Sequence, residues 1–128
     1  IDLYQEQEQL PFLEFEDIRK LEPLKLRKKY QDKISWADKI VFIHPMWWYI
    51  MPAILKNFID QVFTSGFANS IPKATEGLLK GKRASVFLSL DGPKIMYFFL
   101  GMPYYVIWGI ALFKFCGLKI KNIALFQE

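Results

Sequence analysis

Three successive aromatic residues, Trp47, Trp48 and Tyr49, form the most distinctive group of side chains in this sequence. They follow Pro45 and Met46 directly. Because aromatic rings stack favourably in offset geometry, such a group suits the binding of a flat ring. Nearby backbone groups could form hydrogen bonds to the edge of that ring. A buried aromatic cluster would use the same residue types, so the sequence leaves both interpretations open.

Other residues with reactive side chains are few. His44 is the only histidine and could be a general base, although a single histidine at a strand end favours a structural role. Asp91 could be catalytic, but it precedes Gly92 in a turn and needs no further role there. Cys116 is the only cysteine and lies in an apolar stretch, which predicts an inert core thiol. A lone thiol suits the reducing cytoplasm, and no metal site is expected.

The composition narrows the class of protein. A chain of 128 residues predicts one domain, and 52% hydrophobic residues with 23% charged residues exclude a disordered chain. The net charge of +4 is divided among Lys20–Lys33, Lys80–Arg83 and Lys114–Lys121, and no nucleic-acid motif accompanies it. We therefore expect no nucleic-acid partner.

Ile95–Phe113 contains no charged residue over nineteen positions, a length that just meets the requirement of a membrane-spanning helix. However, Gly101, Pro103 and Gly109 interrupt it, and proline removes a helical donor near its centre. We expect no membrane span, but a loop followed by a buried helix around Tyr104–Phe115 whose aromatic residues line a subunit interface.

These residues must be positioned by elements that the apolar pattern predicts. Leu26, Tyr30 and Ile34 recur at the spacing of an amphipathic helix that ends near Trp36–Asp38. A second helix starts with Pro52 at its first position and buries Ile54, Leu55, Phe58, Ile59, Val62 and Phe63, with Lys56, Asn57, Asp60 and Gln61 opposite.

Buried strands are predicted at Lys39–Ile43, Arg83–Leu90 and Lys119–Phe126, and Ile1–Tyr4 reads as the end of another. His44–Tyr49 is predicted as a loop, because Pro45 cannot continue a central strand. Strands alternating with helices indicate an α/β fold with a parallel sheet. Ligands bind at the carboxyl ends of such strands, where Pro45–Tyr49 and Asp91–Pro93 both lie.

Residues Pro45–Phe63 (PMWWYIMPAILKNFIDQVF) resemble the signature of the NAD(P)H quinone dehydrogenases of flavodoxin-like fold. Further matches follow in order at Gly77–Lys82, at Asp91–Gly92 with Met96–Tyr97, and at Phe115–Gly117. The resemblance implies a single flavodoxin-like domain over residues 1–128, a three-layer α/β fold with a parallel sheet.

The resemblance also implies a function. FMN or FAD would lie against Pro45, Met46, Trp47, Trp48, Tyr49, Ser89, Leu90, Asp91 and Gly92. NAD(P)H would give hydride to flavin N5, and a quinone-like acceptor would then take two electrons. Tyr97 would be the catalytic hydroxyl, because Pro103 stands where some relatives have a histidine. Such enzymes are typically homodimers.

The resemblance begins after the family's first strand, phosphate-binding loop and helix, and it stops before the family's last helix. We therefore expect an incomplete, N-terminally truncated fold that binds flavin weakly or not at all. Two alternatives to the enzyme remain: a non-enzymatic regulatory subunit, such as those associated with potassium efflux systems, and an inactive truncated relative.

Overall fold

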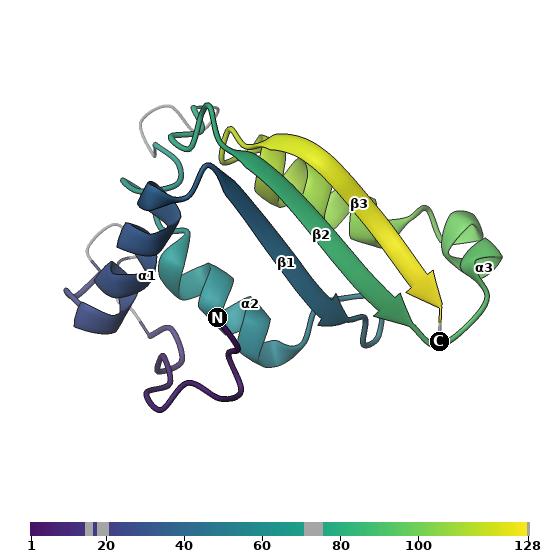
Figure 1. The fold of residues 1–128 in the computed structure, drawn as a ribbon, viewed down its shortest axis with the longest axis horizontal. Helices are drawn as coiled ribbons and strands as arrows, with labels where there is room; N and C mark the ends of the chain where they lie inside the picture. Colours follow the sequence, from purple (N-terminus) through teal and green to yellow (C-terminus); the bar gives the residue numbers. More distant parts are fainter. Residues whose placement is uncertain (15–16, 18–20, 71–75, 128) are drawn as a thin grey trace.

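The structure is a computed structural model that describes residues 1–14, 17, 21–70 and 76–127. The elements in chain order are α1 (Lys25–Trp36), β1 (Lys39–Pro45), α2 (Ala53–Val62), β2 (Arg83–Leu90), α3 (Lys94–Phe99), a π-helix η1 (Tyr105–Lys114) and β3 (Lys119–Gln127) (Figure 1). This is the α/β alternation that the apolar pattern predicts.

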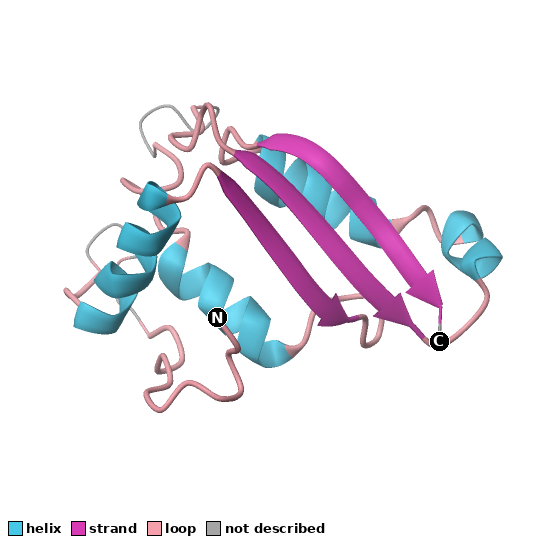
Figure 2. Cartoon of the chain, viewed as in Figure 1, coloured by secondary structure: helices cyan, strands magenta, loops and turns pink. Residues whose placement is uncertain are grey.

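The three strands form one parallel sheet in the order β1-β2-β3 (Figure 2). In the register, Phe42 lies beside Val86 and His44 lies beside Leu88. Because the strands are parallel, their carboxyl ends lie at the same edge of the sheet (Figure 2). The loops after β1 and β2 therefore start side by side, as predicted.

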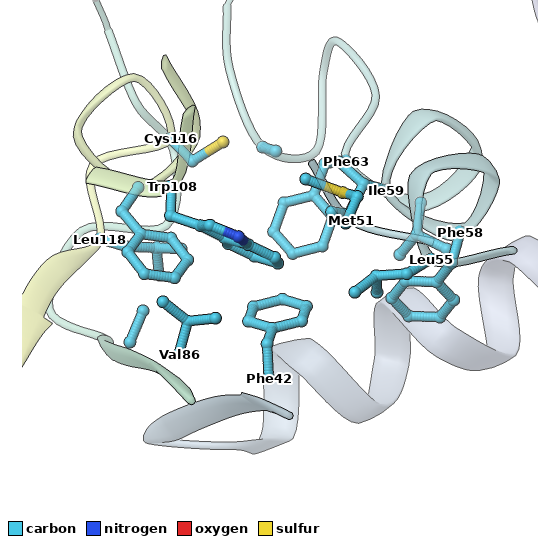
Figure 3. Packing of buried hydrophobic residues seen from close by; sticks show 14 of the residues in the cluster. Phe42, Met51, Leu55, Phe58, Ile59, Phe63, Val86, Trp108, Cys116 and Leu118 are labelled. Carbon is cyan, nitrogen blue, oxygen red and sulfur yellow. The ribbon is translucent and has the colours of Figure 1, made fainter. Parts of the chain in front are cut away.

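The helices α2 and η1 cover one face of this sheet. On that face, Phe42 contacts Phe63, just after α2, with ring centroids 6.2 Å apart, and Trp108 of η1 with centroids 4.7 Å apart (Figure 3). On the opposite face Ile43 is 78% exposed, and no helix of the described residues covers it. The described part of the chain therefore shows two of the three layers that the resemblance implies.

The predicted helices and strands form close to their expected bounds. α1 buries Leu26, Tyr30 and Ile34, and β2 spans the predicted Arg83–Leu90. η1 is followed by Gly117, whose φ of +78° lets the chain turn into β3.

α2 differs from the prediction in two details. Pro52 is the residue before the first turn rather than its first residue. Gln61 is buried, not exposed, because its Oε1 accepts from Arg27 Nη2 at 2.6 Å and its Nε2 donates to the Pro11 carbonyl at 2.9 Å. These two bonds satisfy the buried amide and hold the N-terminal segment against α1 and α2.

The prediction of a strand at Ile1–Tyr4 is wrong. The carbonyl of Asp2 accepts from the backbone N–H groups of Gln5 and Glu6, each at 3.1 Å, and Asp2 Oδ1 accepts from the Tyr4 N–H at 3.0 Å. An aspartate that bonds the backbone two residues on closes a local turn, which competes with strand pairing.

The prediction that Pro45 lies in a loop is also wrong, because β1 continues through His44 and Pro45. Met46 N–H donates to the Ser89 carbonyl at 2.8 Å, so the position of Pro45 faces away from β2. A proline is tolerated in a strand where its missing N–H faces an open edge. Within the described residues β1 is such an edge.

Ile95–Phe113 is divided into two helices. The expected loop at its start is instead the short helix α3, after which Gly101 and Met102 both have positive φ before Pro103. η1 then runs over Tyr105–Lys114, near the predicted Tyr104–Phe115. In the described chain no helix is long and apolar enough to cross a membrane.

Candidate functional site

The candidate site lies at the carboxyl ends of β1 and β2. The register places Pro45 beside Ser89, and the Met46 N–H donates to the Ser89 carbonyl. These contacts bring the two predicted loops together. Pro45 is exposed, whereas the side chain of Met46 is buried in the core.

The residues after β1 form a tight turn. Trp47 and Ile50 exchange two backbone hydrogen bonds, with N···O distances of 2.9 and 3.0 Å. The two central residues, Trp48 and Tyr49, have φ of 50° and 67°. Positive φ at both central positions is typical of a type I′ turn, which usually carries asparagine and glycine. Bulky residues are costly there.

The turn presents its tryptophans to solvent. The side chain of Trp48 is 93% exposed and that of Trp47 is 54% exposed, whereas Tyr49 is half-buried. The alternative of a buried aromatic cluster is therefore wrong for both tryptophans. A flat ligand could reach their rings without unfolding the turn.

The second loop follows β2. Ser89 is half-buried, and its carbonyl is used by Met46. The side chain of Leu90 is buried in the core, so only its backbone could meet a ligand. Asp91 is exposed. Gly92 has φ of +134°, and nothing lies within 4 Å of where a Cβ would stand, so a ligand could approach its backbone closely.

Tyr97 joins the two loops. It is the buried residue of α3, with 9% of its surface exposed. Its ring meets the ring of Tyr49 at 5.3 Å between centroids, with an interplanar angle of 63°. Burial raises the pKa of the Tyr97 hydroxyl, and Tyr49 and Asp91 raise it further. The hydroxyl is therefore protonated at neutral pH and can donate.

Two other reactive groups lie within the core. Burial raises the pKa of the Cys116 thiol to about 11, as expected for an inert thiol. His44 is buried beside Trp108, with ring centroids 5.3 Å apart, and burial lowers its pKa although a hydrogen bond to Pro45 opposes this. His44 is therefore neutral and shielded from solvent, which argues against a general base.

Both loops of the candidate site contain backbone donors without a partner. In the part of the chain that the structure describes, the N–H groups of Trp48, Tyr49, Asp91 and Gly92 make no hydrogen bond. The isoalloxazine ring of a flavin has nitrogen and carbonyl acceptors along its edge and a flat face. Free donors in both loops and exposed rings in the first loop therefore fit a flavin. Sequence patterns cannot show which N–H groups stay unpaired.

A groove of about 510 Å³ lies beside this site rather than on it. Residues 1–4, the open edge of β1 and the start of α2 line it, and Pro45 is its one predicted binding residue. In the described chain, the predicted binding residues other than Pro45 therefore lie outside this groove.

Comparison with known proteins agrees with this architecture. Residues 1–127 match the family described as Flavodoxin-like fold, and the chain belongs to this family. The crystal structure of Smu.1420 from Streptococcus mutans superposes with a TM-score of 0.73 and is 36% identical, covering 90% of this chain and 63% of that one.

Curated relatives are named as oxidoreductases. Human ribosyldihydronicotinamide dehydrogenase [quinone] is 36% identical over 96 residues, which are 70% of this chain and 42% of the relative. An uncharacterized NAD(P)H oxidoreductase of Haemophilus influenzae is 33% identical over 102 residues, which are 76% of this chain and 50% of the relative. The match thus spans at most half the length of either relative.

Proposed function

We propose that this chain belongs to a flavin-dependent NAD(P)H oxidoreductase of the quinone reductase type. The observation that carries the proposal is that exposed Trp47 and Trp48 follow β1 while unpaired N–H groups follow both β1 and β2, whose carboxyl ends the Met46–Ser89 hydrogen bond holds together. The printed names of the relatives support the same class of reaction. The free Cys116 thiol and the NAD(P)H donor favour the cytoplasm.

FMN or FAD, when bound, supplies two-electron hydride transfer from NAD(P)H, through N5, to a quinone-like acceptor. The chain would supply orientation. Trp47 and Trp48 would stack on the ring and exclude water, and the N–H groups of Trp48, Tyr49, Asp91 and Gly92 would bind its edge. This division explains a site with few ionisable side chains.

Tyr97 would be the catalytic residue. Its hydroxyl is protonated at neutral pH, as for an ordinary tyrosine, and the raised pKa extends this range upward. It can therefore donate a hydrogen bond, or a proton, to the acceptor oxygen that gains charge on reduction. Tyr49 fixes the Tyr97 ring by edge-to-face contact.

The protein would act as a homodimer. Exposed apolar residues gather on α3 and the outer side of η1, and we call this set the α3–η1 surface: Ile95, Met96, Phe98, Phe99, Leu100, Tyr105, Val106 and Ile110. Contiguous exposed apolar surfaces of this kind are typical of interfaces.

Sedimentation equilibrium tests whether the protein is a homodimer. A Phe99→Lys variant should be monomeric, whereas a wild-type monomer, or wild-type binding to lipid vesicles through this surface, would contradict it.

Titration with FMN and FAD, followed by assays of NADH and NADPH oxidation with menadione as acceptor, tests the function. In a longer version that adds the family's phosphate-binding loop, we expect flavin binding that quenches tryptophan fluorescence, and turnover that depends on added flavin. This chain alone should bind flavin weakly or not at all. Flavin binding without turnover would favour the regulatory-subunit alternative. Failure of the longer version to bind either flavin would refute the proposal.

A further inference from the structure

The peptide group between Pro45 and Met46 is held at both ends. Its N–H belongs to Met46 and donates to the Ser89 carbonyl of β2 at 2.8 Å. Its carbonyl belongs to Pro45 and accepts from Nδ1 of His44 at 2.7 Å. In a trans peptide these two groups point in opposite directions, so two bonds fix the rotation of one plane.

Strand geometry places the two bonds of this peptide on opposite sides of β1. Alternate residues of a parallel strand face the same neighbour, so Met46 faces β2 and Pro45 faces the opposite side. On that side β1 has no partner strand among the described residues. Among the described residues the Pro45 carbonyl accepts from no backbone N–H, and His44 Nδ1 is its donor.

The His44 ring is itself held in place. It is buried, it lies against Trp108, and its neighbour in the register is Leu88. Because a carbonyl can only accept, Nδ1 carries the proton, and in the neutral ring Nε2 is then a bare acceptor. Nε2 is buried and has no hydrogen-bond partner in the described chain.

An unpaired buried acceptor destabilises the fold, and an apolar side chain at this position would avoid that cost. What histidine adds here is the Nδ1–H donor. The Pro45–Met46 peptide leads directly into the turn that carries Trp47 and Trp48. Its orientation therefore sets the direction in which the chain enters that turn.

We propose that His44 is a positioning residue that orients the Pro45–Met46 peptide and thereby aims the Trp47–Ile50 turn. The consequence for ligand binding rests on the proposed flavin function. The two hydrogen bonds that hold this peptide, which we call the clamp, do not rest on that function. They can be measured without a ligand.

Three variants at His44 separate the donor from the bulk of the ring. His44→Asn keeps an N–H donor near the place of Nδ1, whereas His44→Phe and His44→Leu keep apolar volume and remove the donor. Ser85→Ala is the matched control, because Ser85 Oγ is also buried without a partner in the described chain but lies outside the site. Thermal unfolding of each variant monitors folding.

Hydrogen exchange of the Met46 amide, measured by NMR on the full chain, is the direct readout. We expect exchange to accelerate about 3- to 10-fold in His44→Phe and His44→Leu, and to stay near wild type in His44→Asn and Ser85→Ala. Unchanged exchange in whichever apolar variants fold would overturn the clamp. Acceleration in His44→Asn equal to theirs, or failure of both apolar variants to fold, would assign His44 to the core and overturn it as well.

FMN titration tests the consequence. In His44→Phe we expect weaker FMN binding without a lower melting temperature, and restored binding in His44→Asn. Faster Met46 exchange with unchanged FMN affinity would overturn the positioning role. A longer version with the phosphate-binding loop that binds neither FMN nor FAD would instead refute the proposed function, while the exchange comparison would still decide the clamp.

Discussion

The ring of Tyr49 meets the ring of Tyr97 edge to face, 5.3 Å between centroids and inclined by 63°. The contact joins the turn after β1 to α3, which follows β2, and Tyr97 is the buried residue of that short helix. One aromatic pair therefore sets the distance between the two halves of the candidate site. Such pairs are worth about 0.5–1.5 kcal/mol beyond burial.

Tyr97→Phe should separate the two roles of Tyr97. The phenyl ring keeps its contact with Tyr49, so we expect the melting temperature to stay close to wild type. Loss of the proton donor should lower kcat with menadione about 100-fold. Steady-state kinetics of the flavin-loaded protein measure this. Tyr97→Ala is the comparison and should lower stability too, and an active Tyr97→Phe would show that the hydroxyl is not catalytic.

Trp48→Asn should stabilise the fold while weakening flavin binding. Trp48 has φ of 50°, a conformation that asparagine tolerates far better, so we expect a gain of about 0.5–1 kcal/mol in the free energy of unfolding. Loss of ring stacking should weaken FMN affinity about 3- to 10-fold. Urea denaturation and fluorescence titration measure both quantities.

Trp36→Ala is the control for this variant, because Trp36 is 87% exposed at the end of α1 and lies outside the site. It should leave the FMN affinity and the flavin quenching of the remaining tryptophans unchanged. Equal loss of affinity in the two variants would show that Trp48 has no specific role.

Gly77→Ala should be strongly destabilising. A Cβ at Gly77 would stand 2.1 Å from the Gly117 nitrogen and 2.2 Å from the Cys116 carbonyl carbon, and both are backbone atoms. We expect a loss of about 3 kcal/mol or more in the free energy of unfolding by urea. Gly81→Ala, at φ +89° but in open space, should lose only about 1–2 kcal/mol. Equal losses would indicate that the close approach relaxes easily.

Cys116 should be unreactive in the folded chain. Burial raises the pKa of its thiol to about 11 from an ordinary 9.0, so at pH 8 the thiolate is about 100-fold scarcer. We expect reaction with a thiol-specific disulfide reagent at least about 100-fold more slowly than in urea. Fast reaction of the folded chain would place the thiol at the surface.

Acid should destabilise the fold through His44. Burial holds its pKa below 6.5, so the unfolded chain takes up the proton first as pH falls through about 6.5. The free energy of unfolding that depends on the neutral ring therefore has its full value above that pH. Below it, this free energy falls by at most about 1.4 kcal/mol per pH unit. The difference in unfolding free energy between wild type and His44→Asn should show this slope, whereas a flat difference would contradict it.

Much of the fold follows from local pattern. Leu26, Tyr30 and Ile34 at helical spacing determine α1, and the apolar run Arg83–Leu90 determines β2. Side-chain periodicity and short apolar runs are local properties, so they can be read without knowing the partners. The same holds for the break after β2 at Asp91–Gly92, where glycine is required.

The errors concern residues whose state depends on distant groups. Pro45 lies within a strand because its missing N–H is on the side away from β2, where the described residues supply no partner strand, and only the sheet order reveals this. Gln61 is buried because Arg27 and Pro11 satisfy its amide. Neither partner is close to Gln61 in the sequence, so no local pattern could indicate them.

The sequence by itself determined the strand and helix alternation and placed Trp47, Trp48 and Asp91 at the carboxyl ends of adjacent strands. Only the tertiary structure decided that the tryptophans face solvent, that Tyr49 meets Tyr97 and that His44 holds the Pro45 carbonyl. The physical reason is that periodicity records which residues avoid water. Hydrogen-bond partners and ring contacts depend on how separate elements approach one another, and packing alone determines that approach.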